Sequence, residues 1–202
     1  GSREAGLKLK AAADAVGKPI YLELSSVNPV VILPGALSER GDALAEEFAG
    51  SCLMGAGQFC TNPGLVVLLE GDTTDAFIAE TVKRFGEAPV GTLLSKGVES
   101  SLAKNLQFLA DSGAEVLVGN AAGDDARYSR ANTLLKVSGS QFFAAPETMQ
   151  TEAFGNASLL VVAKDLDEVC DVISALEGNL TGCVYSHTGS DDDAAYDRVA
   201  PV

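Results

Sequence analysis

The chain has 202 residues, of which 14 are Lys or Arg and 28 are Asp or Glu, so its formal net charge is −14 at pH 7. Such an acidic surface repels nucleic acid and anionic membranes, and we expect neither as a partner. The hydrophobic fraction of 47% suffices for one globular core and excludes a disordered chain. No apolar run approaches the ~18 residues of a membrane-spanning helix, and the first residues lack the layout of a signal peptide.

Short apolar runs alternate with longer amphipathic stretches along the chain. The pattern predicts, in chain order, a helix over 3–16, strands over 20–24 and 30–33, a helix over 38–53 with Ser38 as its candidate N-cap, a strand over 65–69, helices over 73–86 and 96–112, strands over 115–118, 132–137 and 159–163, a helix over about 165–177 and a strand over 182–185. Residues 119–131, rich in Gly, Asp, Asn and Ser, are expected to form an exposed loop.

The predicted strands are apolar on both faces, which is typical of a sheet that helices cover on both sides. We therefore expect an α/β fold with a largely parallel sheet. No internal repeat and no long linker divides the chain, so residues 1–202 are read as one domain.

Cysteine and histidine are too sparse for a structural metal site. The cysteines stand at 52, 60, 170 and 183 without a C-x-x-C pair, and His187 is the single histidine. Neither zinc nor a disulfide framework is expected, and we predict a cytoplasmic protein with reduced thiols.

The segment 55–64, Gly-Ala-Gly-Gln-Phe-Cys-Thr-Asn-Pro-Gly, is the most informative stretch. Its glycines and its Pro-Gly pair let the backbone approach a ligand closely and hold the thiol of Cys60 at a turn. Backbone N–H groups in such a turn favour the thiolate and can hold an oxyanion. The alternative is that Cys60 is a small buried hydrophobe, as most free cysteines are. Composition alone favours this reading for Cys60, and more strongly for the other three cysteines.

Two carboxylates form the other candidate positions. Glu23 lies near the end of a predicted strand, and ligands of open α/β sheets bind beyond the carboxyl ends of strands, so Glu23 is placed for a general base. Partial burial of its carboxylate would favour that role. Glu152 and Phe154 precede another predicted strand. Taken singly, an ordinary edge or ion-paired glutamate is the favoured reading of Glu23, and a polar loop with one core Phe is the favoured reading of Glu152-Ala-Phe154.

Together these segments resemble the catalytic domain of the aldehyde dehydrogenase superfamily, and the resemblance covers essentially the whole chain. Gly57-Gln58-x-Cys60 matches the family's Gly-Gln-x-Cys motif, and Glu152-Ala-Phe-Gly-Asn stands where the family has Glu-x-Phe-Gly-Pro. Glu23, Leu24 and Pro29 agree with the family's Glu-Leu-Gly-Gly-Lys-x-Pro, while Ser25, Ser26 and Val27 replace Gly-Gly-Lys. Gly1-Ser2-x-x-x-Gly6 is similar to the family's Gly-Ser turn, and Asn179-Leu-Thr-Gly182 is a looser match to Asn-x-Tyr-Gly-Leu.

The resemblance implies that Cys60 is the nucleophile that attacks an aldehyde carbonyl, with its backbone N–H as one oxyanion donor. Glu23 would activate the water that hydrolyses the resulting thioester. The coenzyme would be NADP or NAD. Its phosphates would lie near Ser2, and its nicotinamide ribose would bind Glu152 with Phe154 packed nearby. The backbone of Leu24 would line the nicotinamide site.

Glu-Leu-Ser-Ser and Gly-Gln-Phe-Cys-Thr-x-Pro-Gly are most similar to the branch that oxidises semialdehydes of ketoacids, such as 2-oxoglutarate semialdehyde. NADP-linked fatty aldehyde dehydrogenases are similar as well. By this resemblance 202 residues are too few for the whole enzyme, so we expect a truncated chain that is inactive by itself and lacks the cofactor-binding domain. The resemblance also implies that the parent enzyme is a homo-oligomer acting on a small-molecule aldehyde.

Two further classes of function remain open. The chain could be an inactive homologue that acts as a binding or assembly module, or a cysteine-dependent esterase without coenzyme. An inactive module needs neither Cys60 nor Glu23, and His187 shares no local motif with Cys60.

Overall fold

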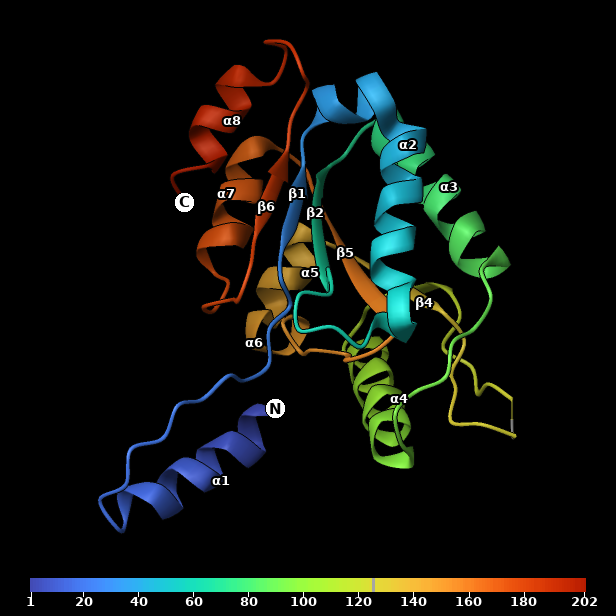
Figure 1. Cartoon of the computed structure of the whole chain (residues 1–202). Helices are drawn as coiled ribbons and strands as arrows, with labels where there is room; N and C mark the ends of the chain where they lie inside the picture. The colour runs from blue at the N-terminus through green and yellow to red at the C-terminus, as the bar shows by residue number, and fades with distance from the viewer. Residues whose placement is uncertain (125) are drawn as a thin grey trace.

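The computed structural model describes residues 1–124 and 126–202, and its strands form one six-stranded sheet in the order β3-β4-β5-β2-β1-β6 (Figure 1). The strands are β1 (Val30–Ile32), β2 (Leu65–Leu69), β3 (Glu115–Val118), β4 (Thr133–Ser138), β5 (Ala157–Ala163) and β6 (Cys183–Tyr185). Neighbouring strands are parallel except for β3 and β4, which are antiparallel. The predicted largely parallel sheet is confirmed.

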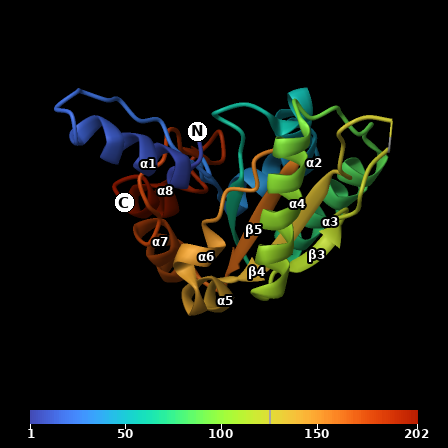
Figure 2. The same ribbon diagram turned by 90° about the horizontal axis from the view of Figure 1, so that it is seen from below.

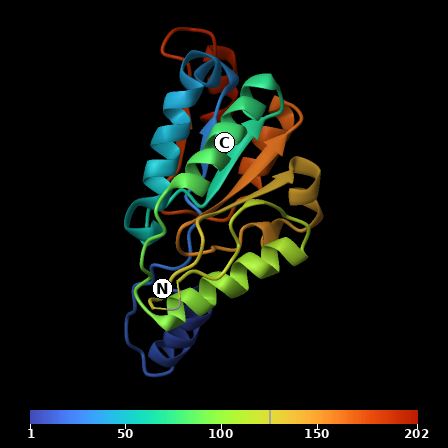
Figure 3. The same ribbon diagram turned by 90° about the vertical axis from the view of Figure 1, so that its right-hand side faces the viewer.

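Alternate residues of each central strand enter two separate cores. In β2, Leu65 and Val67 belong to one core, while Val66 and Leu68 belong to the other. The first core receives side chains of α5 (Gly139–Ala144) and α7 (Leu166–Ser174), and the second receives those of α2 (Pro34–Leu53) and α3 (Asp72–Glu87). Figure 3 shows α2 and α3 together on one side of the strands. Helices therefore cover both faces, and this explains the continuous apolar runs.

Most predicted elements are present with small shifts of their ends. The remaining helices are α1 (Arg3–Asp14), η1 (Met54–Gly57), α4 (Lys96–Asp111), α6 (Pro146–Met149) and α8 (Asp193–Val199). Ser38 is not an N-cap, because α2 begins at Pro34 and continues across non-helical dihedral angles at Arg40. Proline is favourable in the first helical turn, where its missing N–H would have had no helical partner.

The strand predicted over 20–24 is wrong. These residues have no regular secondary structure, and they join α1 to β1. An apolar run becomes a strand only where a neighbouring strand takes up its backbone hydrogen bonds, and no described strand lies beside this one. The side chain of Tyr21 is accordingly 95% exposed.

The N-terminal arm, residues 1–26, projects from the rest of the structure. Figure 1 shows α1 apart from the sheet, and Figure 2 shows α4 crossing in front of β4 and β5 when the molecule is seen from below. Gly6 of α1 packs against Leu24, and Arg3 forms an ion pair with Glu177. Across the described part of the chain, no helix has the length and apolar character needed to cross a membrane.

Candidate active site

One cavity of about 420 Å³ is lined by all six residues that the sequence motifs single out. These are Ser2, Glu23, Leu24, Cys60, Glu152 and Phe154. They come from segments that are far apart in the chain and that precede β1, β2 and β5. Because these strands are parallel, the segments that precede them meet at one edge of the sheet.

The cavity therefore lies at the amino ends of the parallel strands, and the expectation of a site beyond their carboxyl ends is wrong. That rule describes sheets whose loops after the strands are free to hold a ligand. Here the chain passes directly from β1 into α2 after Leu33. The long segments precede the strands instead, and α4 lies beside this edge of the sheet (Figure 2).

The turn that carries Cys60 is built from residues with left-handed backbone angles. Gly55, Ala56 and Gly57 have φ of 56°, 57° and 67°. A Cβ atom on Gly57 would overlap the carbonyl oxygen of Gly155, so the turn packs backbone to backbone on the segment that follows Phe154. This close approach explains why a glycine is needed at position 57.

Gln58 fixes the other side of the same turn. Its Nε2 donates to the carbonyl oxygens of Gly55 at 2.9 Å and Thr92 at 3.2 Å, and its Oε1 accepts from the backbone N–H of Leu94 at 2.7 Å. The amide thus ties the turn to the segment before α4. The Cys60 thiol is exposed, and within the described residues its backbone N–H has no hydrogen-bond acceptor.

Glu23 and Leu24 reach the cavity from the N-terminal arm. Glu23 is exposed, so the partial burial that would favour a general base is not found. Its carbonyl oxygen accepts from the N-terminal amino group of Gly1 at 2.7 Å. Ser2 is the N-cap of α1, with Oγ accepting from Ala5 N–H at 3.4 Å. The arm, rather than the sheet, positions these three predicted residues.

Glu152 and Phe154 lie in the segment that leads to β5. Asn105 of α4 donates from Nδ2 to the Glu152 carbonyl oxygen at 2.8 Å. Burial raises the pKa of the Glu152 carboxyl above its ordinary value, and hydrogen bonds from the Ser26 backbone and the Ser25 hydroxyl oppose that rise. The carboxylate is thus partly desolvated and faces hydroxyl-bearing neighbours.

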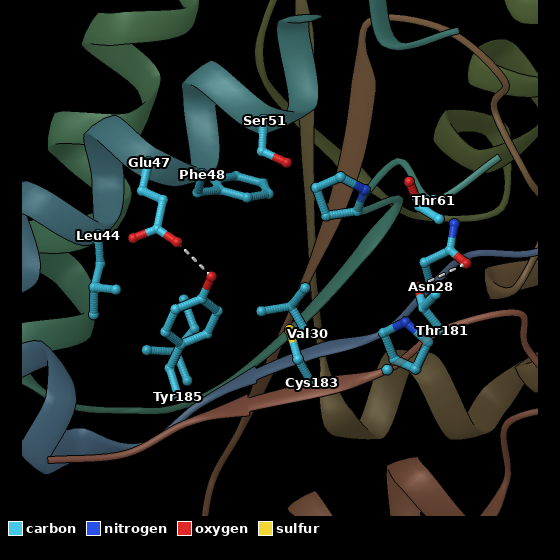
Figure 4. Close-up of a pocket in the computed structure, with 14 residues that line it drawn as sticks. Asn28, Val30, Leu44, Glu47, Phe48, Ser51, Thr61, Thr181, Cys183 and Tyr185 are labelled. Carbon is cyan, nitrogen blue, oxygen red and sulfur yellow. Dashed lines mark hydrogen bonds between the residues drawn. The ribbon is translucent and has the colours of Figure 1, made fainter. Parts of the chain in front are cut away.

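The other cysteines lie outside this cavity. Cys52 is buried in α2, and burial raises its pKa to about 12. Cys183 of β6 lines a second cavity of about 250 Å³ between α2, β1 and β6, which contains none of the six predicted residues (Figure 4). Burial and the nearby Glu47 raise the pKa of Cys183, which disfavours its thiolate form.

Several residues of this site were missed by sequence reasoning. The wall formed by α4 contributes Ser95, Val98, Ser101 and Asn105. Ser95 is the N-cap of α4, and its side chain accepts from Val98 N–H. A serine just before a predicted helix was the available signal for the position of this wall.

No metal centre is evident, since residues 1–124 and 126–202 contain no group of three or more His, Cys, Asp or Glu side chains that could hold an ion.

Comparisons with known proteins agree on one family. A family model described as "Aldehyde dehydrogenase family" matches residues 1–199. Alpha-ketoglutaric semialdehyde dehydrogenase 2 of Azospirillum brasilense is 40% identical over 206 residues, which cover 100% of this chain and 38% of that protein. Alpha-ketoglutaric semialdehyde dehydrogenase of Acinetobacter baylyi is 27% identical over 188 residues, which cover 92% of this chain and 36% of that protein.

A solved structure of betaine aldehyde dehydrogenase from Staphylococcus aureus in complex with NAD⁺ has the same fold. It aligns with a TM-score of 0.81 at 19% identity, over 99% of this chain and 40% of that chain. The chain therefore spans 36% to 40% of the length of these three relatives.

Proposed function

The chain belongs to the aldehyde dehydrogenase family, and from this premise we propose that it is the thiol-bearing catalytic part of an NAD(P)-dependent aldehyde dehydrogenase. The observation that carries the proposal is the shared cavity. Cys60, Glu23 and Glu152, each chosen from a separate sequence motif, line the same space.

Cys60 acts as the nucleophile. Its thiol is exposed to the cavity, whereas Cys52 is buried and Cys183 lies elsewhere. The sulfur forms a bond to the aldehyde carbon, and after oxidation it carries the acyl group as a thioester. The Cys60 backbone N–H, which has no acceptor among the described residues, is available to the oxyanion that develops.

Glu23 acts as the general base of hydrolysis. A base for this step must reach both a water molecule and the acyl group on sulfur, and Glu23 is exposed to solvent at the wall of the cavity. It takes a proton from water as the water attacks the thioester. The products are the free Cys60 thiol and a carboxylate.

The wall made by Glu152, Ser95, Ser101 and Asn105 fits the nicotinamide ribose of a dinucleotide coenzyme. The hydroxyl groups of a ribose can donate hydrogen bonds to a partly desolvated carboxylate. The hydroxyl and amide groups of the same wall can form further hydrogen bonds with the ribose. Phe154 supplies an apolar surface for the flat ring, and Leu24 and Ser2 complete the wall on the side of the arm. A bound nicotinamide coenzyme supplies the hydride acceptor of the oxidation.

The substrate class is the semialdehyde of a ketoacid. The support is the 40% identity to a protein named alpha-ketoglutaric semialdehyde dehydrogenase, over the full length of this chain. The second candidate, a fatty aldehyde with NADP, rests on the sequence resemblance to NADP-linked fatty aldehyde dehydrogenases.

The test uses the whole enzyme that contains this chain, with 2-oxoglutarate semialdehyde or a long-chain fatty aldehyde, and with NAD or NADP. We expect formation of reduced coenzyme with the semialdehyde, and a loss of at least about 10³-fold in kcat for Cys60→Ser. The matched control, Cys183→Ser, should retain wild-type turnover. Full turnover in Cys60→Ser would overturn the mechanism, and turnover with the fatty aldehyde alone would overturn the substrate class. A wild-type enzyme that oxidises neither aldehyde would favour the inactive binding module.

A further inference from the structure

Asn28 holds the backbone of the Cys60 turn from behind. It is 3% exposed, and its Nδ2 donates to the carbonyl oxygen of Cys60 at 3.0 Å and to that of Asn62 at 2.8 Å. The peptide groups that follow Cys60 and Asn62 are therefore both held by one side chain. Its φ of 46° lies in the left-handed region, which asparagine tolerates better than most residues.

The acceptor end of the same side chain is also fully used. Asn28 Oδ1 accepts from Ser26 Oγ at 2.8 Å and from Thr181 Oγ1 at 3.2 Å. Figure 4 shows Asn28 beside Thr181, with Thr61 of the Cys60 turn nearby. With two donated and two accepted bonds, the amide has no freedom to turn.

Ser26 extends this network towards Glu23. Its hydroxyl lies 3.1 Å from Asn179 Oδ1 and accepts from the backbone N–H of Leu180 at 2.9 Å. The Ser26 hydroxyl thus links Asn28 both to the segment 23–26 and to the loop before β6.

We propose that Asn28 is a positioning residue for the Cys60 thiol, and that through Ser26 it holds the turn in register with the segment that carries Glu23. This inference rests on the proposed role of Cys60 as nucleophile. Removal of the amide leaves the two carbonyl groups without their donor. Because an unsatisfied buried polar group is costly, these peptide groups rotate to find water. Rotation moves the thiol, and small displacements of a reacting group reduce turnover strongly.

The test compares Asn28→Gly and Asn28→Asp with wild type in the whole enzyme. Glycine keeps the left-handed backbone and removes all four bonds, whereas aspartate keeps the two accepted bonds and loses both donated ones. Asn120→Gly is the matched control, since Asn120 also has a left-handed φ, of 54°, and its side chain accepts from Arg130. The readouts are kcat, KM and the rate of iodoacetamide alkylation of Cys60 relative to Cys183, followed by peptide mass spectrometry.

For both Asn28 variants we expect kcat to fall by about tenfold or more with little change in KM, and the ratio of Cys60 to Cys183 alkylation to fall. Asn120→Gly should change neither readout. The inference is overturned if a folded Asn28 variant keeps both wild-type values, or if only its melting temperature falls. If the wild-type enzyme oxidises no aldehyde, the proposed function fails, and the alkylation ratio still decides whether Asn28 positions the thiol.

Discussion

At the scale of single residues, the site depends on backbone contacts as much as on reactive side chains. The Cys60 turn packs on Gly155 through Gly57, and Gln58 and Asn28 hold it from two further sides. Cys60, Glu23 and Glu152 could be predicted from local motifs, because the residue type and the spacing identify them in the sequence. Asn28 could not be found in this way, since its role arises from contacts with Cys60 and Asn62 that only the fold creates.

Gly57→Ala tests the packing of the turn. The new Cβ would overlap the Gly155 carbonyl oxygen, and the alanine would also have to adopt a left-handed φ. We expect a loss of about 2–4 kcal/mol in the free energy of unfolding, measured by urea titration. The control is Gly50→Ala, in α2, where a Cβ would meet nothing and alanine favours the helix. Equal stability of the two variants would contradict the close approach.

Glu152→Gln tests the wall assigned to the coenzyme. Loss of a charged acceptor should weaken coenzyme binding in the whole enzyme by about 10- to 100-fold, measured by fluorescence titration. The control Glu147→Gln changes an exposed carboxylate of α6 that does not line the cavity, and should leave affinity unchanged. Unaltered affinity in Glu152→Gln would remove this residue from the binding site.

The same variant has a defined pH dependence of stability. Burial raises the folded-state pKa of Glu152, so the folded protein binds this proton more tightly than the unfolded chain does. Wild-type stability therefore falls as pH rises from the ordinary pKa of a glutamate through the raised value. Glutamine does not titrate. The free energy of unfolding of the variant should therefore rise relative to that of wild type across that pH interval, and the difference should be constant above it. Thermal unfolding at a series of pH values measures this difference, and a constant difference would contradict the burial.

At the scale of elements, the apolar runs of β1, β2 and β5 were sufficient to predict their strands, because helices bury both faces of the sheet. The run over 20–24 is also largely apolar but has no pairing partner among the described strands, and pairing is a property of the fold. The short helix α5 was missed although Ser138 and Gln141 form a capping box, a local signal that an apolar periodicity search does not see.

The start of α2 is stabilised by a residue more than 150 positions away. Asp192 is 4% exposed and accepts from the N–H groups of Gly35 at 2.8 Å, Ala36 at 2.9 Å and His187 at 2.8 Å. Asp192 therefore caps the N-terminus of α2, where the N-cap residue Leu33 has no side-chain acceptor.

Asp192→Asn should lower the free energy of unfolding by about 1–3 kcal/mol. An amide has only one acceptor oxygen, so it cannot replace the two carboxylate oxygens that accept from the three N–H groups. Asp193→Asn, the adjacent and exposed carboxylate of α8, should change it little. Urea titration of both variants measures the difference, and an equal effect of the two would show that Asp192 does not cap α2.

At the scale of the whole molecule, the cavity is formed by two parts, the body and the projecting arm. The body contributes Cys60, Glu152 and Phe154, and the projecting arm contributes Ser2, Glu23 and Leu24. The arm also exposes apolar side chains, including Leu9, which is 62% exposed. We propose that further parts of the enzyme cover the arm and exclude water from the cavity, as hydride transfer requires.

The chain of 202 residues by itself should therefore not reduce NAD or NADP with any aldehyde, whereas the whole enzyme should. The chain spans 38% of the length of the relative from Azospirillum brasilense. Absorbance of the reduced coenzyme measures this directly. Turnover by the isolated chain would contradict the assignment of a separate coenzyme-binding part.

The central claim is that Cys60 carries the acyl group and that Glu23 releases it. In the whole enzyme, Glu23→Gln should slow hydrolysis by about 10²–10⁴-fold while leaving acylation intact. Rapid quenching after mixing with semialdehyde and coenzyme, followed by peptide mass spectrometry, should find the acyl group on the peptide that contains Cys60, in an amount equal to the initial burst of reduced coenzyme. An unmodified Cys60 peptide after such a burst, or acylation at Cys183 instead, would contradict the account.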